Sequence, residues 1–176
     1  IPLMNLPSNT LRLTLGYGHT VIALTDTEII RLRVHSESAR PVETIPFSRL
    51  PSDRRSPLVA IGEGAGQVVV VSEDFVSYVF DSDSLELTNV YKVVGRFRGA
   101  KPSSVVIASG GPPQMIYHLN SGRIVSFESM PPDTFSEARR PRFRSARAEE
   151  LQLRGVRCAL SIDVDDSGRL YVSDAQ

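Results

Sequence analysis

The chain has 176 residues, of which 41% are apolar and 23% are charged, and its 20 basic residues balance its 20 acidic residues. This content of apolar residues excludes a disordered chain, and a single Cys excludes both a disulfide scaffold and a Cys-based zinc site. The length predicts one domain, residues 1–176. No apolar run reaches 18 residues, so we expect no membrane span. The balanced charge argues against a protein that binds nucleic acid over its whole surface.

Apolar residues recur at a spacing of two or in short β-branched runs, and both patterns predict β-strands. In chain order, short strands are predicted over residues 11–15, 21–24, 30–34, 58–61, 68–71, 75–80, 85–91, 105–108, 115–119, 124–127, 159–164 and 170–172. A glycine-rich turn is predicted over residues 62–66, before a run that is typical of a strand buried on both faces. About a dozen short strands indicate an all-β sandwich, barrel or propeller.

One segment breaks this pattern. Residues 130–144 hold Pro141 and a group of arginines, and they are interpreted as a long inserted loop. Residues 145–153 are rich in Ala, Glu and Leu, which favour helix, so one short helix is expected to follow. The predicted insertion thus covers about residues 130–150 of an otherwise β-rich domain.

A local feature repeats along the chain: an apolar run ends in a hydroxyl residue that is followed by an acid or a tight turn. The copies begin at Leu24, Val71, Ala108 and Val172, at intervals of 47, 37 and 64 residues. Propeller blades of four strands recur at about 40–50 residues. The repeat therefore favours stacked antiparallel blades, in a partial or small propeller.

Residues 161–175, SIDVDDSGRLYVSDA, resemble the first hairpin of a β-propeller blade of the NHL or WD40-like kind. The Trp-Asp pair of WD40 repeats is absent, since the chain has no Trp. This resemblance implies rigid sheets that present loops to partner proteins. Alternatively, residues 21–45 are similar to the β-meander of polo-box modules, with a second copy starting in residues 68–90. That alternative implies two six-stranded sheets with a long helix, and a docking domain for a partner peptide.

Five arginines lie within nine residues of the predicted insertion. Guanidinium groups form forked contacts with carboxylates and phosphates, so this segment is the candidate partner-binding element. We expect an acidic protein segment as its partner, in preference to nucleic acid. Neighbouring acids at Glu137, Glu149 and Glu150 offer the alternative of a locally neutralised, solvated loop. The candidate residues are Arg139, Arg140, Arg142, Arg144 and Arg147.

Asp163, Asp165 and Ser167 have the oxygen spacing of a calcium loop, and Asp174 stands where its last carboxylate would be. The same residues also form an ordinary hairpin turn, which is the interpretation we favour. The three histidines are scattered without metal-ligand spacing. We therefore expect no metal and no cofactor.

No phosphate-binding loop and no nucleophile elbow is found in the sequence. These patterns favour a non-catalytic protein-interaction module or scaffold within a larger assembly. The single unpaired Cys158 favours an intracellular, reducing compartment. Two alternatives remain open: a propeller enzyme such as a metal-dependent hydrolase, and an RNA-contacting subunit whose binding would weaken steeply with salt.

Overall fold

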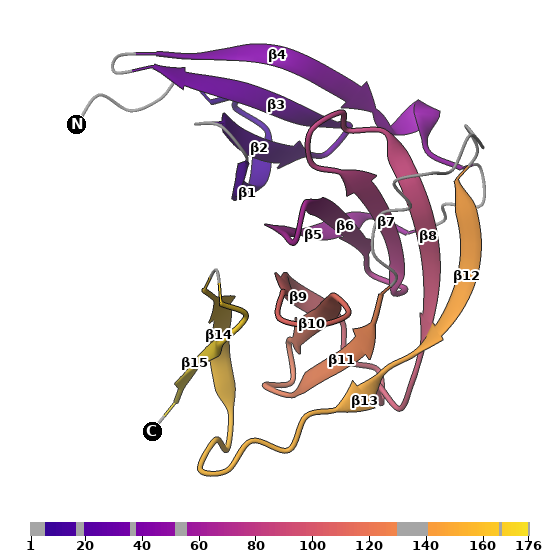
Figure 1. Ribbon diagram of the computed structural model, residues 1–176, viewed down its shortest axis with the longest axis vertical. Helices are drawn as coiled ribbons and strands as arrows, with labels where there is room; N and C mark the ends of the chain where they lie inside the picture. Colours follow the sequence, from indigo (N-terminus) through magenta and orange to yellow (C-terminus); the bar gives the residue numbers. More distant parts are fainter. Residues whose placement is uncertain are drawn as a thin grey trace.

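The fold is almost entirely β, with its strands grouped in sheets that fan out around a common centre (Figure 1). The computed structural model describes residues 6–16, 20–35, 38–51, 56–129, 141–165 and 167–175. In these ranges the only helical element is a short 3-10 turn, η1 (Phe47–Arg49). The prediction of an all-β, propeller-like fold is confirmed.

Four sheets, here called blades 1 to 4, follow one another along the chain. Blade 1 contains β1 (Thr10–Gly16), β2 (Thr20–Thr25), β3 (Glu28–His35) and β4 (Ser38–Pro46). Blade 2 contains β5 (Leu58–Gly64), β6 (Gln67–Ser72), β7 (Val76–Asp81), β8 (Leu87–Val94) and the later β12 (Arg142–Arg147). Blade 3 contains β9 (Pro102–Ala108), β10 (Gln114–Leu119), β11 (Ile124–Glu128) and β13 (Glu149–Glu150). Blade 4 contains β14 (Ala159–Val164) and β15 (Leu170–Asp174).

In blades 1, 2 and 3 the first strand lies on the inner side of the arc, and the last strand lies at its outer rim (Figure 1). The inner strands β1, β5, β9 and β14 contact one another in that order. Neighbouring strands within a blade are antiparallel, except that β12 runs parallel to β8. This is the radial order of propeller blades, and the described strands do not form the two six-stranded sheets of the polo-box alternative.

Apolar clusters fill the spaces between successive blades. Between blades 2 and 3, Val69 and Val79 pack with Tyr117 and Phe127. The phenolic oxygen of Tyr117 lies 2.7 Å from Ser77 Oγ, so a buried hydrogen bond also crosses this interface. Strand β6 is buried along its whole length, as its run of four valines predicted.

The glycine-rich segment differs from its prediction, because Gly62 and Gly64 lie inside β5 and only Ala65 and Gly66 form the turn. A Cβ atom at Gly62 would lie 2.3 Å from the carbonyl oxygen of Val105 on β9. These glycines therefore allow the inner strands of blades 2 and 3 to approach closely.

The repeated hydroxyl residue occupies the same place in three blades. Thr25, Ser72 and Ser173 lie at the end of the second strand of blades 1, 2 and 4. The Thr25 and Ser72 oxygens each accept a hydrogen bond, at 3.0 Å, from the N–H that begins the next strand. The predicted third copy is wrong, because Ser109 follows the first strand of blade 3. The equivalent turn in that blade begins at Asn120, after β10.

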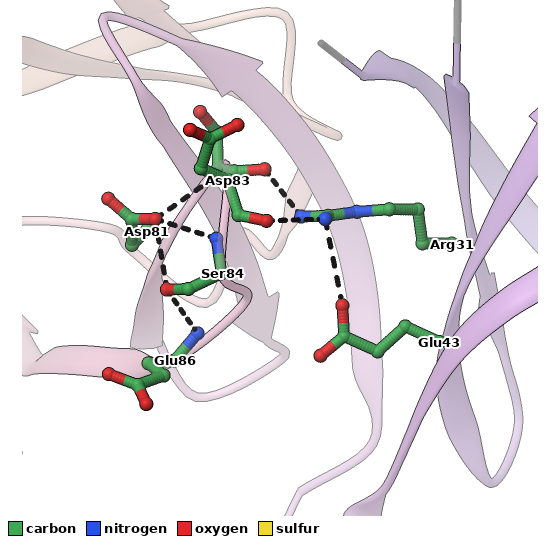
Figure 2. A network of polar contacts seen from close by, with 7 residues as sticks. Arg31, Glu43, Asp81, Asp83, Ser84 and Glu86 are labelled. Atoms are coloured by element: carbon green, nitrogen blue, oxygen red, sulfur yellow. Dashed lines mark hydrogen bonds and ion pairs between the residues drawn. The ribbon is translucent and has the colours of Figure 1, made fainter. Parts of the chain in front are cut away.

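Blades 1 and 2 are also joined by a half-buried arginine, Arg31 (Figure 2). The Arg31 guanidinium on β3 donates hydrogen bonds to the carbonyl oxygens of Ser82 and Asp83, in the turn between β7 and β8. Glu43 on β4 lies 3.6 Å from the same group. The turn is itself ordered by Asp81, whose Oδ1 accepts the backbone N–H of Asp83 at 3.0 Å. Arg31 therefore holds the two blades together at their outer part.

The segment predicted as loop and helix folds differently where the structure describes it. Residues 142–147 form β12 along β8, and residues 149–150 form β13 as the fourth strand of blade 3. The chain thus leaves blade 3, adds a fifth strand to blade 2, and returns. The helix prediction for residues 145–153 is wrong, because backbone partners on β8 and burial of Ala148 outweigh the helix propensity of Ala and Glu.

Candidate functional site

A pocket of about 980 Å³ lies at the outer rim between blades 2 and 3. Its walls are the end of β8 with the turn after it, strand β11, and the link between β12 and β13. Stacking of Phe97 on Phe75, with ring centroids 3.7 Å apart, holds the turn after β8 in place. Four arginines and two glutamates supply the charges of the lining: Arg96, Arg98, Arg123, Arg147, Glu149 and Glu150.

Arg123 and Glu150 neutralise each other within this pocket. Arg123 Nε donates to Glu150 Oε1 at 2.9 Å, and a second N–H of the guanidinium donates to Oε2. Arg123 also donates to the carbonyl oxygen of Arg96 at 3.0 Å. The forked contact lowers the pKa of Glu150 and raises the pKa of Arg123. This pair ties β13 to the turn after β8, and its two charges offset each other.

The remaining arginines of the pocket are exposed. Arg96, Arg98 and Arg147 form no ion pair with a carboxylate in the described part of the chain. Glu149 is the single acid of the lining outside the Arg123–Glu150 pair. The pocket therefore presents an excess of positive charge.

Strand β12 carries three of the predicted arginines, and the last of them, Arg147, lines the pocket. Its register places Arg142 and Arg144 on one face of the strand and Phe143 and Arg147 on the other. Phe143 is 58% exposed, and Arg144 Nε is buried without a hydrogen-bond partner among the described residues. No described strand pairs with the side of β12 away from β8. We call Arg96, Arg98, Arg142, Arg144 and Arg147 the arginine surface.

The structure describes three of the five arginines that the sequence analysis named as candidate partner-binding residues. Arg142, Arg144 and Arg147 lie on one edge strand, while Arg139 and Arg140 lie outside the described residues. Arg96 and Arg98 were not predicted. They lie in the turn after β8, some 40 residues before β12 in the chain, and this turn comes near β12 only because β12 pairs in parallel with β8. The signal that could have identified them is the pair of arginines on either side of a single Phe.

The residues with the spacing of a calcium loop are not brought together. Asp165 lies at the turn of the β14–β15 hairpin, whereas Asp174 pairs with Ala159 at the opposite end. Asp165 Oδ1 accepts the N–H groups of Ser167 and Arg169, and Asp174 accepts those of Arg157 and Cys158. Asp163 Oδ1 accepts a hydrogen bond from the backbone N–H of Val164. Within the described ranges, no group of three His, Cys, Asp or Glu side chains is arranged to hold a metal ion.

These turn carboxylates predict how blade 4 responds to acid. Hydrogen bonds from Cys158 and Arg157 hold the pKa of Asp174 below its usual value, and those from Ser167 and Arg169 do the same for Asp165. The unfolded chain, with Asp pKa values near about 3.9, then binds more protons than the folded one. The stabilisation is present above that pH and is lost as pH falls through the lower folded pKa.

We expect the amide resonances of Cys158 and Arg169 to shift together as pH is lowered below about 4, in a two-dimensional NMR titration. The Asp174→Asn variant should lose the Cys158 shift and keep that of Arg169. A wild-type titration at the ordinary Asp pKa would contradict the hydrogen bonds described above.

The buried histidine has a structural environment. His118 Nδ1 lies 2.8 Å from Ser103 Oγ, and Nε2 lies 2.8 Å from the carbonyl oxygen of Ala159 on β14. The His118 Nε2–H donates to the carbonyl oxygen, so the ring links blades 3 and 4, and the Ser103 hydroxyl also lies 3.1 Å from the carbonyl oxygen of His118. Among the described residues, no helix is long and apolar enough to cross a membrane.

Comparison with known proteins identifies the fold alone. No family model matches the chain, and no curated protein matches it significantly. It is similar to the extracellular domain of the hybrid two-component system BT3049 from B. thetaiotaomicron (TM-score 0.52, 11% identity), over 97% of this chain and 22% of that one. It is also similar to KlHsv2 with a replaced loop (TM-score 0.52, 13% identity), over 85% of this chain and 46% of that one.

A third similar structure is BamB from Moraxella catarrhalis, a β-propeller (TM-score 0.51, 11% identity), over 96% of this chain and 46% of that one. The chain therefore spans less than half the length of each of these structures. At such identities the likeness establishes a propeller-like fold and leaves the function open.

Proposed function

We propose that this protein is a non-catalytic interaction module whose arginine surface binds an extended, acidic segment of a partner protein. The observation that carries the proposal is that three of the predicted arginines lie on β12, an edge strand within the described part of the sheet, beside a pocket with two further exposed arginines. The intracellular location expected from the unpaired Cys158 stays a prediction.

An edge strand binds an extended segment through its backbone. The N–H and C=O groups on the side of β12 that no described strand pairs with can bind one more strand, and these backbone contacts supply affinity without regard to sequence. Specificity then comes from the side chains: exposed Phe143 offers an apolar contact, and the arginines offer forked contacts to carboxylates. An alternating acidic and apolar segment fits both features.

The test measures binding of a short fluorescent peptide of alternating Glu and Val by anisotropy. Replacing Arg142, Arg144 and Arg147 with Ser should weaken binding at least about tenfold, since each charge-assisted hydrogen bond is worth about 1.5–3 kcal/mol. The charge-matched control replaces Arg40, Arg49 and Arg154, which are exposed elsewhere, and should leave binding unchanged.

The same measurement with a single-stranded RNA oligonucleotide tests the alternative that the arginine surface binds RNA. Tighter binding of RNA than of the acidic peptide, with a steep loss of affinity in salt, would replace this proposal by the RNA-contacting alternative. Equal binding of an alternating Lys and Val peptide would show that the arginines do not select their partner.

A further inference from the structure

The pocket between blades 2 and 3 carries positive charge that its own lining does not neutralise. Four arginines and two glutamates give the lining a net charge of +2. Arg123 and Glu150 offset each other in their forked ion pair, and Glu149 is the single acid left. Three arginines remain, and their exposed side chains form no hydrogen bond or ion pair with any described residue: Arg96, Arg98 and Arg147.

Backbone contacts bring these arginines to one place. Strand β12 runs along β8 and ends at Arg147, which lies opposite Val94 in the register (Figure 1). The N–H of Ala148 donates to the carbonyl oxygen of Val94 at 2.9 Å. Arg96 follows Val94 by two residues, and its carbonyl oxygen accepts a hydrogen bond from Arg123 at 3.0 Å. The wall of the pocket is therefore held by its backbone, and the side chains of Arg96 and Arg147 are left to bind a ligand.

Arg98 occupies a backbone position that does not favour arginine. Its φ is 51°, and Gly99 follows with a φ of 78°, in a turn where the N–H of Ala100 donates to the carbonyl oxygen of Phe97 at 2.9 Å. Asn and Gly adopt such left-handed conformations more readily than Arg. The turn itself therefore gives no reason for an arginine. Its positive charge does reach the pocket, since it interacts with the Glu150 carboxylate.

The charge and the size of the pocket fit a phosphate monoester on a larger ligand. Such a group carries about two negative charges at neutral pH, and arginine binds its oxygens in forked contacts, whereas a carboxylate has a single charge. The volume of about 980 Å³ is far larger than a phosphate group, and Val94, Phe97 and Val125 make part of the wall apolar. The pocket therefore has room for a phosphorylated side chain together with the residues next to it.

We propose that the pocket binds a phosphorylated side chain of the partner protein, at the end of the bound segment that reaches Arg147. The position follows from β12, because a segment paired along its free edge passes Arg142 and Arg144 and arrives at the pocket beside Arg147. The inference rests on the proposed function for this path along β12, and it adds one chemical group to the segment.

Fluorescence anisotropy with matched peptides and the 176-residue chain tests the inference. One peptide of alternating Glu and Val ends in phosphoserine, and its match ends in Ser. Because a strand can pair with β12 in either direction, one pair of peptides carries this residue at the N-terminal end and a second pair at the C-terminal end. In one of the two pairs, the phosphorylated peptide should bind at least about tenfold more tightly than its match.

Arg98→Asn tests whether this gain arises in the pocket. Asn suits the left-handed backbone at this position, so the fold should persist, which circular dichroism checks. The ratio of the two affinities should fall below about threefold. The matched control is Arg154→Asn, because Arg154 is also exposed and also precedes a glycine in a four-residue turn, away from the pocket. This control should keep the full ratio.

Phenyl phosphate gives a readout that does not depend on the peptide. It should shift the amide resonances of Arg98 and Glu149 in NMR spectra. Its affinity should fall about tenfold between about pH 7.5 and about pH 5, because the dianion becomes a monoanion near pH 6. The arginines of the pocket stay charged over this range. Protonation of Glu149 or Glu150 would make the pocket more positive and strengthen binding, so a loss of affinity identifies the phosphate as the titrating group.

Three results would overturn the inference. Equal binding of the phosphorylated and Ser peptides would contradict the phosphate group and leave the proposed function standing. Binding of neither peptide would contradict the proposed function, and this inference with it. Diphenyl phosphate, a diester with a single charge, might be compared in the same titration, and binding as tight as that of phenyl phosphate would indicate a site for a phosphodiester such as the RNA backbone.

Discussion

Replacing Gly62 with alanine is expected to destabilise the protein by about 3 kcal/mol, at the upper end of what overpacking usually costs. The added methyl group would lie 2.3 Å from the carbonyl oxygen of Val105 and 3.3 Å from its Cγ1. The atom in the way belongs to the backbone of β9, which is held in register by Tyr117 on β10. The inner strands of blades 2 and 3 must therefore separate, and the apolar cluster behind them loosens.

Urea denaturation measures this effect, with Gly111→Ala as the matched control. A Cβ at Gly111 meets no atom within 4 Å, and its backbone does not lie in the left-handed region. The control should change the free energy of unfolding by less than about 0.5 kcal/mol. A Gly62→Ala protein as stable as this control would show that the two inner strands are not so closely packed.

Much of the fold can be predicted from the sequence because most strands have a recognisable pattern of apolar residues within their own few residues. The alternation in residues 30–34 and the apolar run of residues 68–71 both reflect burial, which acts on single side chains. The alternation in residues 11–15 also predicted a strand, although its leucines are exposed. The glycine-rich segment misled the prediction for a different reason. Gly62 is required by a backbone on another blade, and a contact between distant segments leaves no local pattern.

The same distinction explains what could be foreseen of the site. The cluster of arginines is visible in the sequence, but its strand is formed by pairing with β8, some fifty residues earlier in the chain. Local propensity favoured a helix there, and tertiary pairing decided otherwise. The partner of Glu150 could not be foreseen either, since Arg123 reaches it only after β13 has joined blade 3.

Replacing Tyr117 with alanine should destabilise the protein by about 3–5 kcal/mol, because it removes a fully buried aromatic ring. The ring packs edge-on against Phe75, with centroids 6.2 Å apart, and at 5.7 Å against Phe127. Its hydroxyl is also the partner of Ser77 in the core of the interface between blades 2 and 3. The loss therefore combines a cavity with an unpaired buried hydroxyl group.

Tyr117→Phe separates these two contributions. It keeps the ring and removes one hydrogen bond, so the expected loss is about 1 kcal/mol. Ser77→Ala should lower the free energy of unfolding by at least as much, since it leaves the phenolic hydroxyl of Tyr117 buried without this partner. The double variant should cost less than the sum of the single ones, and strict additivity in urea denaturation would contradict the hydrogen bond.

Alkaline pH offers an independent readout of the same group. Burial raises the pKa of the Tyr117 phenol above its usual value. In the unfolded chain the Tyr117 phenol ionises near pH 10. The stabilisation from Tyr117 is therefore present below that pH and is lost as pH rises beyond it. Between pH 9 and about 11, wild type should therefore lose more stability than Tyr117→Phe, and equal losses would place the phenol in contact with water.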